Sequence, residues 1–228
     1  ANRKLQELDQ LKSNFISTVS HELRTPLTSI KAYAEILLDS PHIEPQTGKR
    51  FLDIIDKETN RMSRLITDLL NLEKIESGTT TWVMNLCDLR EIIGTAITVL
   101  APSAAEKSIS VTLRAGESQR VRADPDRIQD VITNLIGNGI KFCRPGGHIE
   151  VHLRQTNASS PGGLPGEYVQ VAVTDDGPGI AADEHDHVFD KYYQGTRSGS
   201  AGPGSGLGLA ISKEIGRHHR GEIWLESQ

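Results

Sequence analysis

A histidine with reactive neighbours lies near the start of the chain, in the stretch SHELRTPL at residues 20–27. Glu22 follows His21 directly, and Thr25 comes four residues after His21. A neutral imidazole is a nucleophile at physiological pH, and a carboxylate that accepts from one ring nitrogen leaves the lone pair of the other free to attack. A lone histidine among polar residues is usually only solvated, so a nucleophilic role needs support from the rest of the chain.

Two glycine-rich stretches could bind a flat or anionic ligand. The first, DDGPGI, places the carboxylate of Asp175 before Gly177 and Gly179 at the end of a β-rich run. The second, GPGSGLGL at residues 202–209, opens a helix-like stretch, where unpaired backbone N–H groups favour phosphate. The second stretch is not a Walker A loop, because no Lys-Ser/Thr pair follows the glycines, and its spacing is not that of a Rossmann fingerprint.

A third group of polar residues lies on one predicted helix. Asn134 and Asn138 are four residues apart and therefore share a helix face, with Lys141 about one turn further along. Two amides and an ammonium group on one face can hold the water shell of a magnesium ion and a phosphate chain. Taken alone, the group could equally be an ordinary polar helix face.

The histidine stretch lies in the first of two long predicted helices. Apolar residues recur in steps of three and four on both, which is the pattern of amphipathic helices. Residues 39–48, DSPHIEPQTG, separate the helices. The apolar positions of the first are Phe15, Val19, Leu23, Leu27, Ile30, Ala34 and Leu37, and the heptad of the second is Phe51, Ile55, Glu58, Met62, Leu65, Leu69 and Leu72.

A single helical hairpin would cover these apolar seams only partly. We therefore predict a homodimer in which two hairpins form a four-helix bundle; the alternative is a hairpin that packs on its own C-terminal domain. His21 is about 200° around the helix from Val19 and Leu23, so it is predicted to face away from the seam. Pro26 leaves the carbonyl of Glu22 without its helical donor and is predicted to bend the helix.

Beyond a linker around residues 77–81, strands and helices alternate, which indicates a two-layer α/β or α+β domain. The stretch 157–166, rich in Gly, Pro and Ser, is predicted to be an excursion between two strands. The predicted strands are 108–114, 148–155, 168–174 and 222–226, and the predicted helices are 88–100, 125–141 and 205–217.

Composition excludes several classes of protein. The 25 Lys and Arg residues are balanced by 30 Asp and Glu residues, and a net charge of −5 does not favour non-specific binding of nucleic acid. The two cysteines, Cys87 and Cys143, are far apart and suggest neither a disulfide framework nor a zinc site. No apolar run approaches the roughly 20 residues that cross a bilayer. We therefore expect a cytoplasmic location for this chain, whether or not its parent protein is tethered to a membrane.

The chain resembles the sensor histidine kinases of two-component systems in five motifs that occur in the family's order. They are the phosphoacceptor box SHELRTPL, the asparagine box at residues 134–142, the first glycine box DDGPGI, the phenylalanine box at residues 188–194 and the second glycine box GSGLGLAISK. The resemblance implies a dimerisation and phosphotransfer domain at residues 1–78, a linker at 79–87, and an α/β sandwich ATP-binding domain of the gyrase and chaperone type at 88–228. Members of the family usually continue into a further strand, so the sheet is expected to lack an edge strand.

The resemblance also implies roles for single residues. His21 would receive the γ-phosphoryl group of ATP, and the pattern Glu22-x-x-Thr25 would hold the water that removes phosphate from a partner's aspartate. Asp175 would accept from the amino group of adenine as a buried carboxylate, and Asn138 would bind Mg²⁺. The other nucleotide-binding residues implied are Asn134, Lys141, Gly177, Gly179, Gly204, Gly206, Leu207 and Gly208.

One position distinguishes this chain from the ATPases that share the domain. Their typical water-activating glutamate corresponds to Asn134 here, so direct hydrolysis of ATP is expected to be slow. Residues 183–203 resemble a lid that orders over the nucleotide. The implied partners are a second copy, a response-regulator receiver domain and an upstream sensor or coiled coil. A dimeric scaffold that binds nucleotide without phosphotransfer, and a protein that is mainly a phosphatase, are the alternatives.

Overall fold

The computed structural model describes residues 2–40, 43–116, 119–156, 168–195 and 205–227, with side chains from Ser17 onward. The chain divides into two compact units, Ala1–Asn71 and Leu72–Gln228. Among the helices of these described ranges, none combines the length and the apolar character needed to span a membrane.

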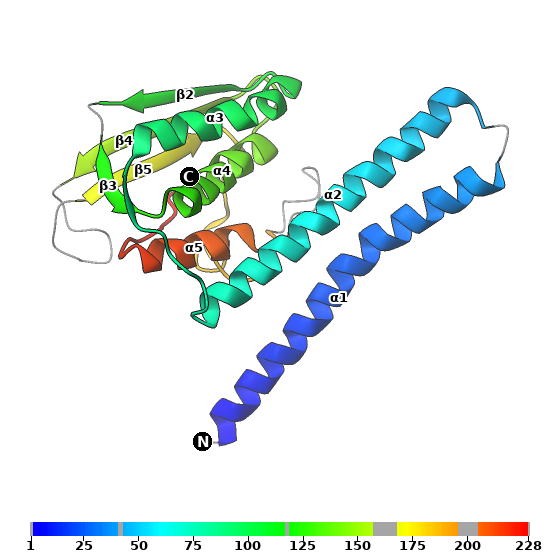
Figure 1. Cartoon of the computed structure of the whole chain (residues 1–228), viewed down its shortest axis with the longest axis horizontal. Coiled ribbons are helices and arrows are strands. Elements are labelled where there is room, and N and C mark those ends of the chain that lie inside the picture. The colour runs from blue at the N-terminus through cyan, green and yellow to red at the C-terminus, as the bar shows by residue number, and fades with distance from the viewer. Residues whose placement is uncertain (1, 41–42, 117–118, 157–167, 196–204, 228) are drawn as a thin grey trace. The chain divides into compact units, whose positions relative to one another are not determined.

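The N-terminal unit is a helical hairpin. Helix α1 (Asn2–Asp39) and helix α2 (Pro45–Glu76) run in opposite directions from the connection at residues 40–44 (Figure 1). The rings of Tyr33 and Phe51 meet across the hairpin with centroids 5.0 Å apart. Gly48 is buried, and a methyl group there would come within 3.4 Å of the side chain of Ile43. These contacts confirm the predicted pair of amphipathic helices.

The hairpin leaves large apolar side chains in solvent. Leu27 on α1 and Leu52 on α2 are 55% and 58% exposed, although both belong to or flank the predicted seams. Further exposed apolar side chains of the unit are Ile36, Leu38, Ile66 and Leu70. Several large exposed apolar side chains on one helical hairpin are typical of a surface that another helix covers.

The C-terminal unit is an α/β sandwich. Strand β4 (His148–Thr156) lies between β2 (Ser110–Ala115), which is parallel to it, and β5 (Tyr168–Asp175), which is antiparallel. Helices α3 (Leu89–Glu106) and α4 (Pro125–Phe142) cover one face of this sheet (Figure 1), and α5 (Gly208–His218) packs on α4. The predicted α/β sandwich is thus confirmed. Its core contains Leu89, Ile92, Ile93, Ala96, Ile132, Ile136, Ile140, Ile149, Val151 and Leu153.

Two strands were not predicted from the sequence, and one predicted strand is wrong. β1 (Asn85–Asp88) pairs with β3 (Arg120–Ala123), so part of the predicted linker 79–87 belongs to a strand pair of the C-terminal unit. The predicted strand 222–226 is not a strand, because a strand requires a neighbouring ladder and these residues form none. The predicted domain boundaries at residues 78 and 88 stay a proposal.

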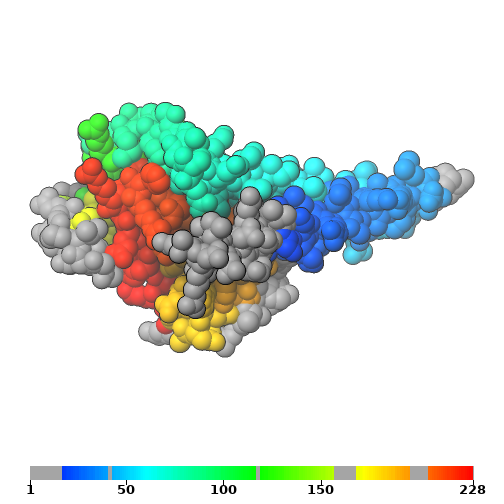
Figure 2. Space-filling model, turned by 90° about the horizontal axis from the view of Figure 1, so that it is seen from below, coloured from blue at the N-terminus to red at the C-terminus, as the bar shows by residue number. Residues whose placement is uncertain are grey.

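A buried carboxylate ties the segment before β1 to α4. Asp124, only 4% exposed, accepts from the backbone N–H of Val83 at 2.9 Å and, as the N-cap of α4, from that of Arg127 at 3.2 Å. The neighbouring Trp82 stacks on His218, with ring centroids 4.5 Å apart. Figure 2 shows the same segment, in turquoise, against the red C-terminal stretch that begins at α5.

We expect Asp124→Ala to destabilise the C-terminal unit by about 2–3 kcal/mol, because it removes both a helix cap and the charged acceptor of the Val83 N–H. Urea unfolding followed by tryptophan fluorescence is a suitable measurement, since both tryptophans, Trp82 and Trp224, lie in this unit. The control is Asp88→Ala at the N-cap of α3, whose carboxylate accepts from Arg90 and for which a loss of about 1 kcal/mol is expected. Equal losses for the two variants would contradict the tie to Val83.

Candidate functional site

His21 lies on an exposed polar stripe of α1, as predicted. Its neighbours along this stripe are Ser17, Arg24, Thr25 and Thr28, and all of them are exposed. The hydroxyl of Thr25 donates to the carbonyl of His21 at 3.2 Å, within the helix. The imidazole is thus accessible, which a group that attacks an external phosphate requires.

Glu22 has a partner on the other helix of the hairpin. Its carboxylate pairs with Arg61 of α2 at 3.2 Å, and Arg61 also lies 3.7 Å from Glu58. Both side chains of the first pair are less than 20% exposed, so the pair is screened less than one at the surface. Within the described residues no hydrogen bond joins Glu22 to the imidazole of His21, and the orientation of His21 by Glu22 stays a prediction.

α1 continues through Pro26 without interruption, and Pro26 is buried. Proline has no N–H, so the carbonyl of Glu22 lacks its usual helical donor. The predicted bend at this position stays a prediction.

The asparagine box and the second glycine box meet between α4 and α5. The amide of Asn134 donates to the hydroxyl of Ser212 at 3.0 Å, and that hydroxyl donates to the carbonyl of Gly208 at 2.9 Å. A methyl group on Gly208 would lie 2.2 Å from the amide oxygen of Asn134, so only glycine fits there. Ser212 was not singled out from the sequence, although its position four residues after Gly208 was a signal that it lies one turn along.

Asp175 lies at the end of β5, next to α4. Its carboxylate accepts from the backbone N–H of Gly177 at 2.9 Å. Gly139 on α4 faces this strand end: a methyl group there would lie 3.0 Å from Ile149 of β4 and 3.7 Å from Cβ of Asp175. Gly139, which was also missed in the sequence, lets α4 approach the sheet closely beside Asp175.

The expected burial of Asp175 is not observed. Asp175 is exposed, because the sheet opens to solvent where β5 ends. Asn138 is half-buried, and its amide has no hydrogen-bond partner in the part of the chain that the structure describes. Lys141 places its ammonium group over the ring of Phe142, 4.9 Å from the centroid.

The turns before α5 depend on glycine. Gly206 has φ of +64°, and a methyl group there would lie 2.6 Å from the backbone of Tyr192. The carbonyl of Gly206 accepts from the N–H of Tyr192 at 2.8 Å. Leu207 is buried, and α5 begins at Gly208 rather than at the predicted residue 205. The other glycine at positive φ in the predicted site is Gly179, at +69°.

The first part of the predicted lid is held to the domain. Besides the contact of Tyr192 with Gly206, the ammonium group of Lys213 on α5 lies 5.3 Å from the ring centroid of Phe189. A short 3-10 helix, η1 (Ala182–Glu184), begins this part, and burial raises the pKa of Tyr192 to about 12. Gly204 and lid residues 196–203 lie outside the described residues, as does the predicted excursion at 157–166.

Asp176, next to Asp175, is held by hydrogen bonds. Its carboxylate accepts from the thiol of Cys143 at 2.7 Å and from the backbone N–H of His148 at 3.1 Å. The thiol bond and then the backbone N–H lower the pKa of Asp176. Burial, followed by the bond to this carboxylate, raises the pKa of Cys143.

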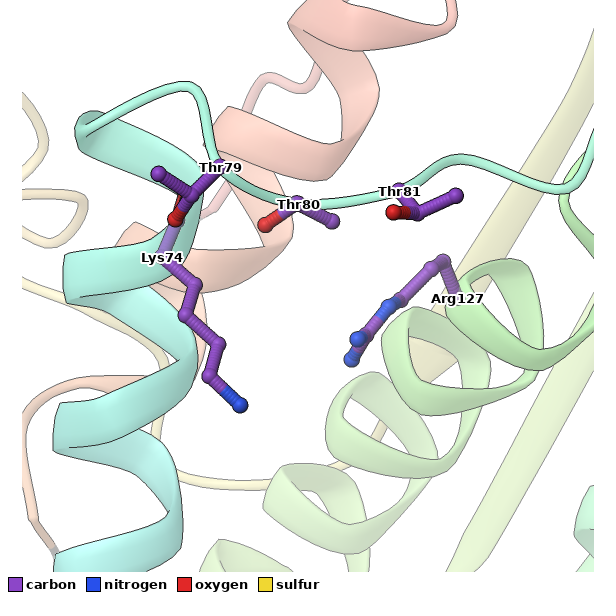
Figure 3. A pocket seen from close by; sticks show the side chains of 5 residues that line it. All are labelled: Lys74, Thr79, Thr80, Thr81 and Arg127. Atoms are coloured by element: carbon purple, nitrogen blue, oxygen red, sulfur yellow. The ribbon is translucent and has the colours of Figure 1, made fainter.

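A cationic pocket lies away from these residues. It has a volume of about 380 Å³ and is lined by Lys74, Arg127 and Thr79–Thr81, with both cationic side chains reaching into it (Figure 3). A second pocket, of about 430 Å³, is lined by residues of β1 and the adjoining turns of α3 and α4. Neither contains a residue of the asparagine or glycine boxes. The described residues of the predicted nucleotide site lie on α4, at and just after the end of β5, and at the start of α5.

Comparison with known proteins identifies both parts of the chain. Residues 11–78 match the His Kinase A (phospho-acceptor) domain, and residues 123–228 match the histidine kinase-, DNA gyrase B- and HSP90-like ATPase domain. A sensor protein kinase WalK of Staphylococcus saprophyticus is 34% identical over 224 residues, which is 97% of this chain and 35% of the relative. The chain thus spans about a third of that protein's length.

Solved structures share the fold. The histidine kinase AdeS of Acinetobacter baumannii has a TM-score of 0.71 at 22% identity and matches over 91% of each chain. The histidine kinase ThkA, solved in complex with the response regulator protein TrrA, has a TM-score of 0.72 at 24% identity, covering 99% of this chain and 61% of ThkA. With a phospho-acceptor hairpin that exposes its histidine and an ATPase domain that assembles the asparagine and glycine boxes, this chain belongs to the sensor histidine kinases.

Proposed function

We propose that this chain transfers the γ-phosphoryl group of ATP to His21 and then to an aspartate of a response-regulator receiver domain. The observation that carries the proposal is the contact of Asn134 with Ser212 and Gly208, because it joins motifs some 70 residues apart into one surface. The exposed imidazole of His21 supplies the acceptor. Asn134 is not a base that could activate water, which favours transfer to a side chain over hydrolysis.

In this proposal ATP lies on the surface of α4, β5 and the start of α5. Asp175 accepts from the adenine amino group, and a guanine carbonyl at the same place would leave the carboxylate unpaired, so adenine is favoured. Gly177 and Gly179 let the backbone approach the base. The start of α5 provides backbone N–H groups for phosphate at Gly206 and Gly208, with Gly204 and Lys141 as further contacts. The N–H of Leu207 donates to the hydroxyl of Ser205 at 3.2 Å and would have to exchange that partner for phosphate.

The amide oxygen of Asn138 is a suitable ligand for a hydrated magnesium ion. An amide oxygen is a hard ligand, and the half-buried amide of Asn138 is not engaged by another described side chain. Mg²⁺ usually keeps several waters and binds through one or two protein oxygens and the substrate phosphates, so a single amide is sufficient. When bound, the ion would supply neutralisation of phosphate charge.

The reaction at His21 needs no strong general base. One ring nitrogen of the neutral imidazole attacks the γ-phosphorus, a nitrogen–phosphorus bond forms, and the bond to the leaving ADP oxygen breaks. The exposed stripe around His21 leaves room for a phosphate and, in the second step, for the aspartate of a regulator. We infer that a nucleotide and a regulator approach the same face of α1 in turn.

A second copy of the chain is the partner that we propose for the hairpin. It would cover the apolar side chains that the hairpin leaves in solvent, among them Leu27, Leu52, Ile66 and Leu70. We also propose an upstream sensor or coiled coil, because the apolar pattern of α1 reaches back to Leu5. Since ATP is the substrate, the core would act in the cytoplasm.

Phosphatase activity toward the regulator is a second proposed function. Glu22 and Thr25 are three residues apart on α1, and the hydroxyl of Thr25 is exposed beside His21. A hydroxyl at this position can hold a water against a phosphorylated aspartate. This role requires Thr25 but not the nucleophilic imidazole.

We expect wild-type protein incubated with γ-labelled ATP and Mg²⁺ to acquire an acid-labile, base-stable label, and His21→Gln to acquire none, because phosphohistidine hydrolyses in acid. His152→Gln, which removes an imidazole from β4, is the matched control and should be labelled like wild type. Label on His21→Gln, or none on wild type, would refute His21 as the acceptor.

Gly208→Ala should weaken ATP binding at least about tenfold, equivalent to about 1.4 kcal/mol, since the new methyl group displaces Asn134. Gly216→Ala is the control on the same helix, where a methyl group meets nothing within 4 Å and affinity should be unchanged. Titration calorimetry measures both. Equal affinities would show that the contact of Asn134 with Gly208 does not shape the site.

Thr25→Ala should slow dephosphorylation of the regulator about a hundredfold, the lower range of a catalytic positioning effect, and leave labelling of His21 within about twofold. The rate is measured with phosphorylated regulator and ADP. Thr28→Ala, one turn along the same stripe, is the control. A Thr25→Ala protein with the full phosphatase rate would exclude the water-holding role.

A further inference from the structure

Three segments of the C-terminal unit meet at Asp176. Cys143 follows the last residue of α4, Gly147 directly precedes β4, which begins at His148, and Asp176 follows β5. One carboxylate oxygen of Asp176 accepts two hydrogen bonds, from the thiol of Cys143 at 2.7 Å and from the backbone N–H of His148 at 3.1 Å. We call this group of Cys143, Gly147, His148 and Asp176 the thiol clasp.

The protonation states of Cys143 and Asp176 in the thiol clasp favour a hydrogen bond from the thiol to the carboxylate. Cys143 is only 3% exposed, and burial keeps its pKa above the usual range, so the thiol stays protonated at neutral pH. The pKa of Asp176 is lowered, chiefly by the bond from that thiol, so its carboxylate stays ionised. A neutral donor and a charged acceptor form a stronger bond than two neutral groups.

The space around the clasp admits no side chain at residue 147. A methyl group on Gly147 would lie 2.3 Å from the sulfur of Cys143 and 2.4 Å from the bonded oxygen of Asp176. Arg144 adds an ion pair to the other oxygen of Asp176, at 3.8 Å. Both oxygens of this carboxylate are therefore engaged, which restricts its rotation.

The clasp links the two halves of the nucleotide surface. Its thiol is attached to the end of α4, which carries Asn134, Asn138 and Lys141, and its carboxylate is attached to the residue after Asp175. Asp175 is exposed, and within the described ranges its carboxylate accepts only from the N–H of Gly177 in the same turn. Its backbone is the last paired position of β5, opposite Ile149 of β4. The strand pairing thus holds the side of Asp175 that precedes the turn, and Asp176 holds the side that follows it.

We propose that Cys143 is a positioning residue for adenine recognition, whose thiol holds Asp176 so that Asp175 faces the base. This inference rests on the proposed binding of ATP. Cys143 does not touch the nucleotide in this scheme; it acts through Asp176. Without the thiol donor, Asp176 is no longer fixed and the turn that carries Asp175 can change its orientation. The preference for adenine over guanine then falls, because it depends on the direction of the Asp175 carboxylate.

The test compares Cys143→Ser, Cys143→Ala and Cys143→Val in the whole chain. Affinities for ATP and GTP are measured by titration calorimetry, and thermal unfolding is recorded for each variant. Serine keeps a donor and should bind ATP within about twofold of wild type. Alanine and valine should bind ATP about tenfold more weakly, the loss expected for one charge-assisted hydrogen bond, with a reduced preference for ATP over GTP.

Valine separates the hydrogen bond from packing, because it fills the space of the thiol without a donor. Cys87→Ala is the matched control: Cys87 is the other cysteine, its thiol donates to the carbonyl of Val121 at 3.5 Å on β3, and its loss should not change either affinity.

Valine binding ATP as tightly as serine, or a loss of affinity that follows thermal stability with an unchanged ATP preference, would overturn the proposal. Wild type that binds no ATP would overturn the proposed function and, with it, this inference. If wild type binds ATP, the comparison of the valine variant with the serine variant tests this inference alone.

Discussion

Gly139 lets α4 lie close to β4 and β5, and the proposed nucleotide surface depends on this contact. A methyl group on Gly139 would lie 3.0 Å from the side chain of Ile149, closer than an ordinary van der Waals contact, so the helix or this side chain would have to shift. Gly139 also lies close to the end of β5, where a methyl group would be 3.7 Å from Cβ of Asp175, the first residue of the first glycine box. The core below consists of aliphatic side chains such as Ile136 and Ile149, both fully buried, which hold the two layers together and are costly to disturb.

Glycine has the same function at the second contact of α4. Gly208 has no side chain, so α5 starts against Asn134, and the hydroxyl of Ser212 completes the contact. A helix N-terminus then faces the same surface as Asn138. In a chain with a net charge of −5, a polyanionic ligand cannot rely on a general positive field, and oriented N–H groups and amides provide local donors instead.

Local patterns predicted much of this molecule. The apolar period of the first helix determined that His21 faces away from Val19 and Leu23, since helical geometry alone relates these positions. The asparagine box, with its two amides one turn apart, was placed on a helix for the same reason, and Pro125 marked where that helix begins. Strand 222–226 was wrong because an alternating pattern predicts only the capacity for a strand, and pairing needs a neighbour.

The sequence by itself therefore determined which residues face outward and which motifs are present, because these follow from spacing along one helix or turn. The expectation of phosphotransfer came from the resemblance of five motifs to the sensor histidine kinases. Only the tertiary structure decided that Glu22 pairs with Arg61, that Asp175 is exposed and that Cys143 donates to Asp176. Each of these depends either on the distance between segments that are 30 or more residues apart or on the solvent exposure of a side chain. The packing of whole helices and strands sets both quantities, and the spacing of residues along the chain does not contain them.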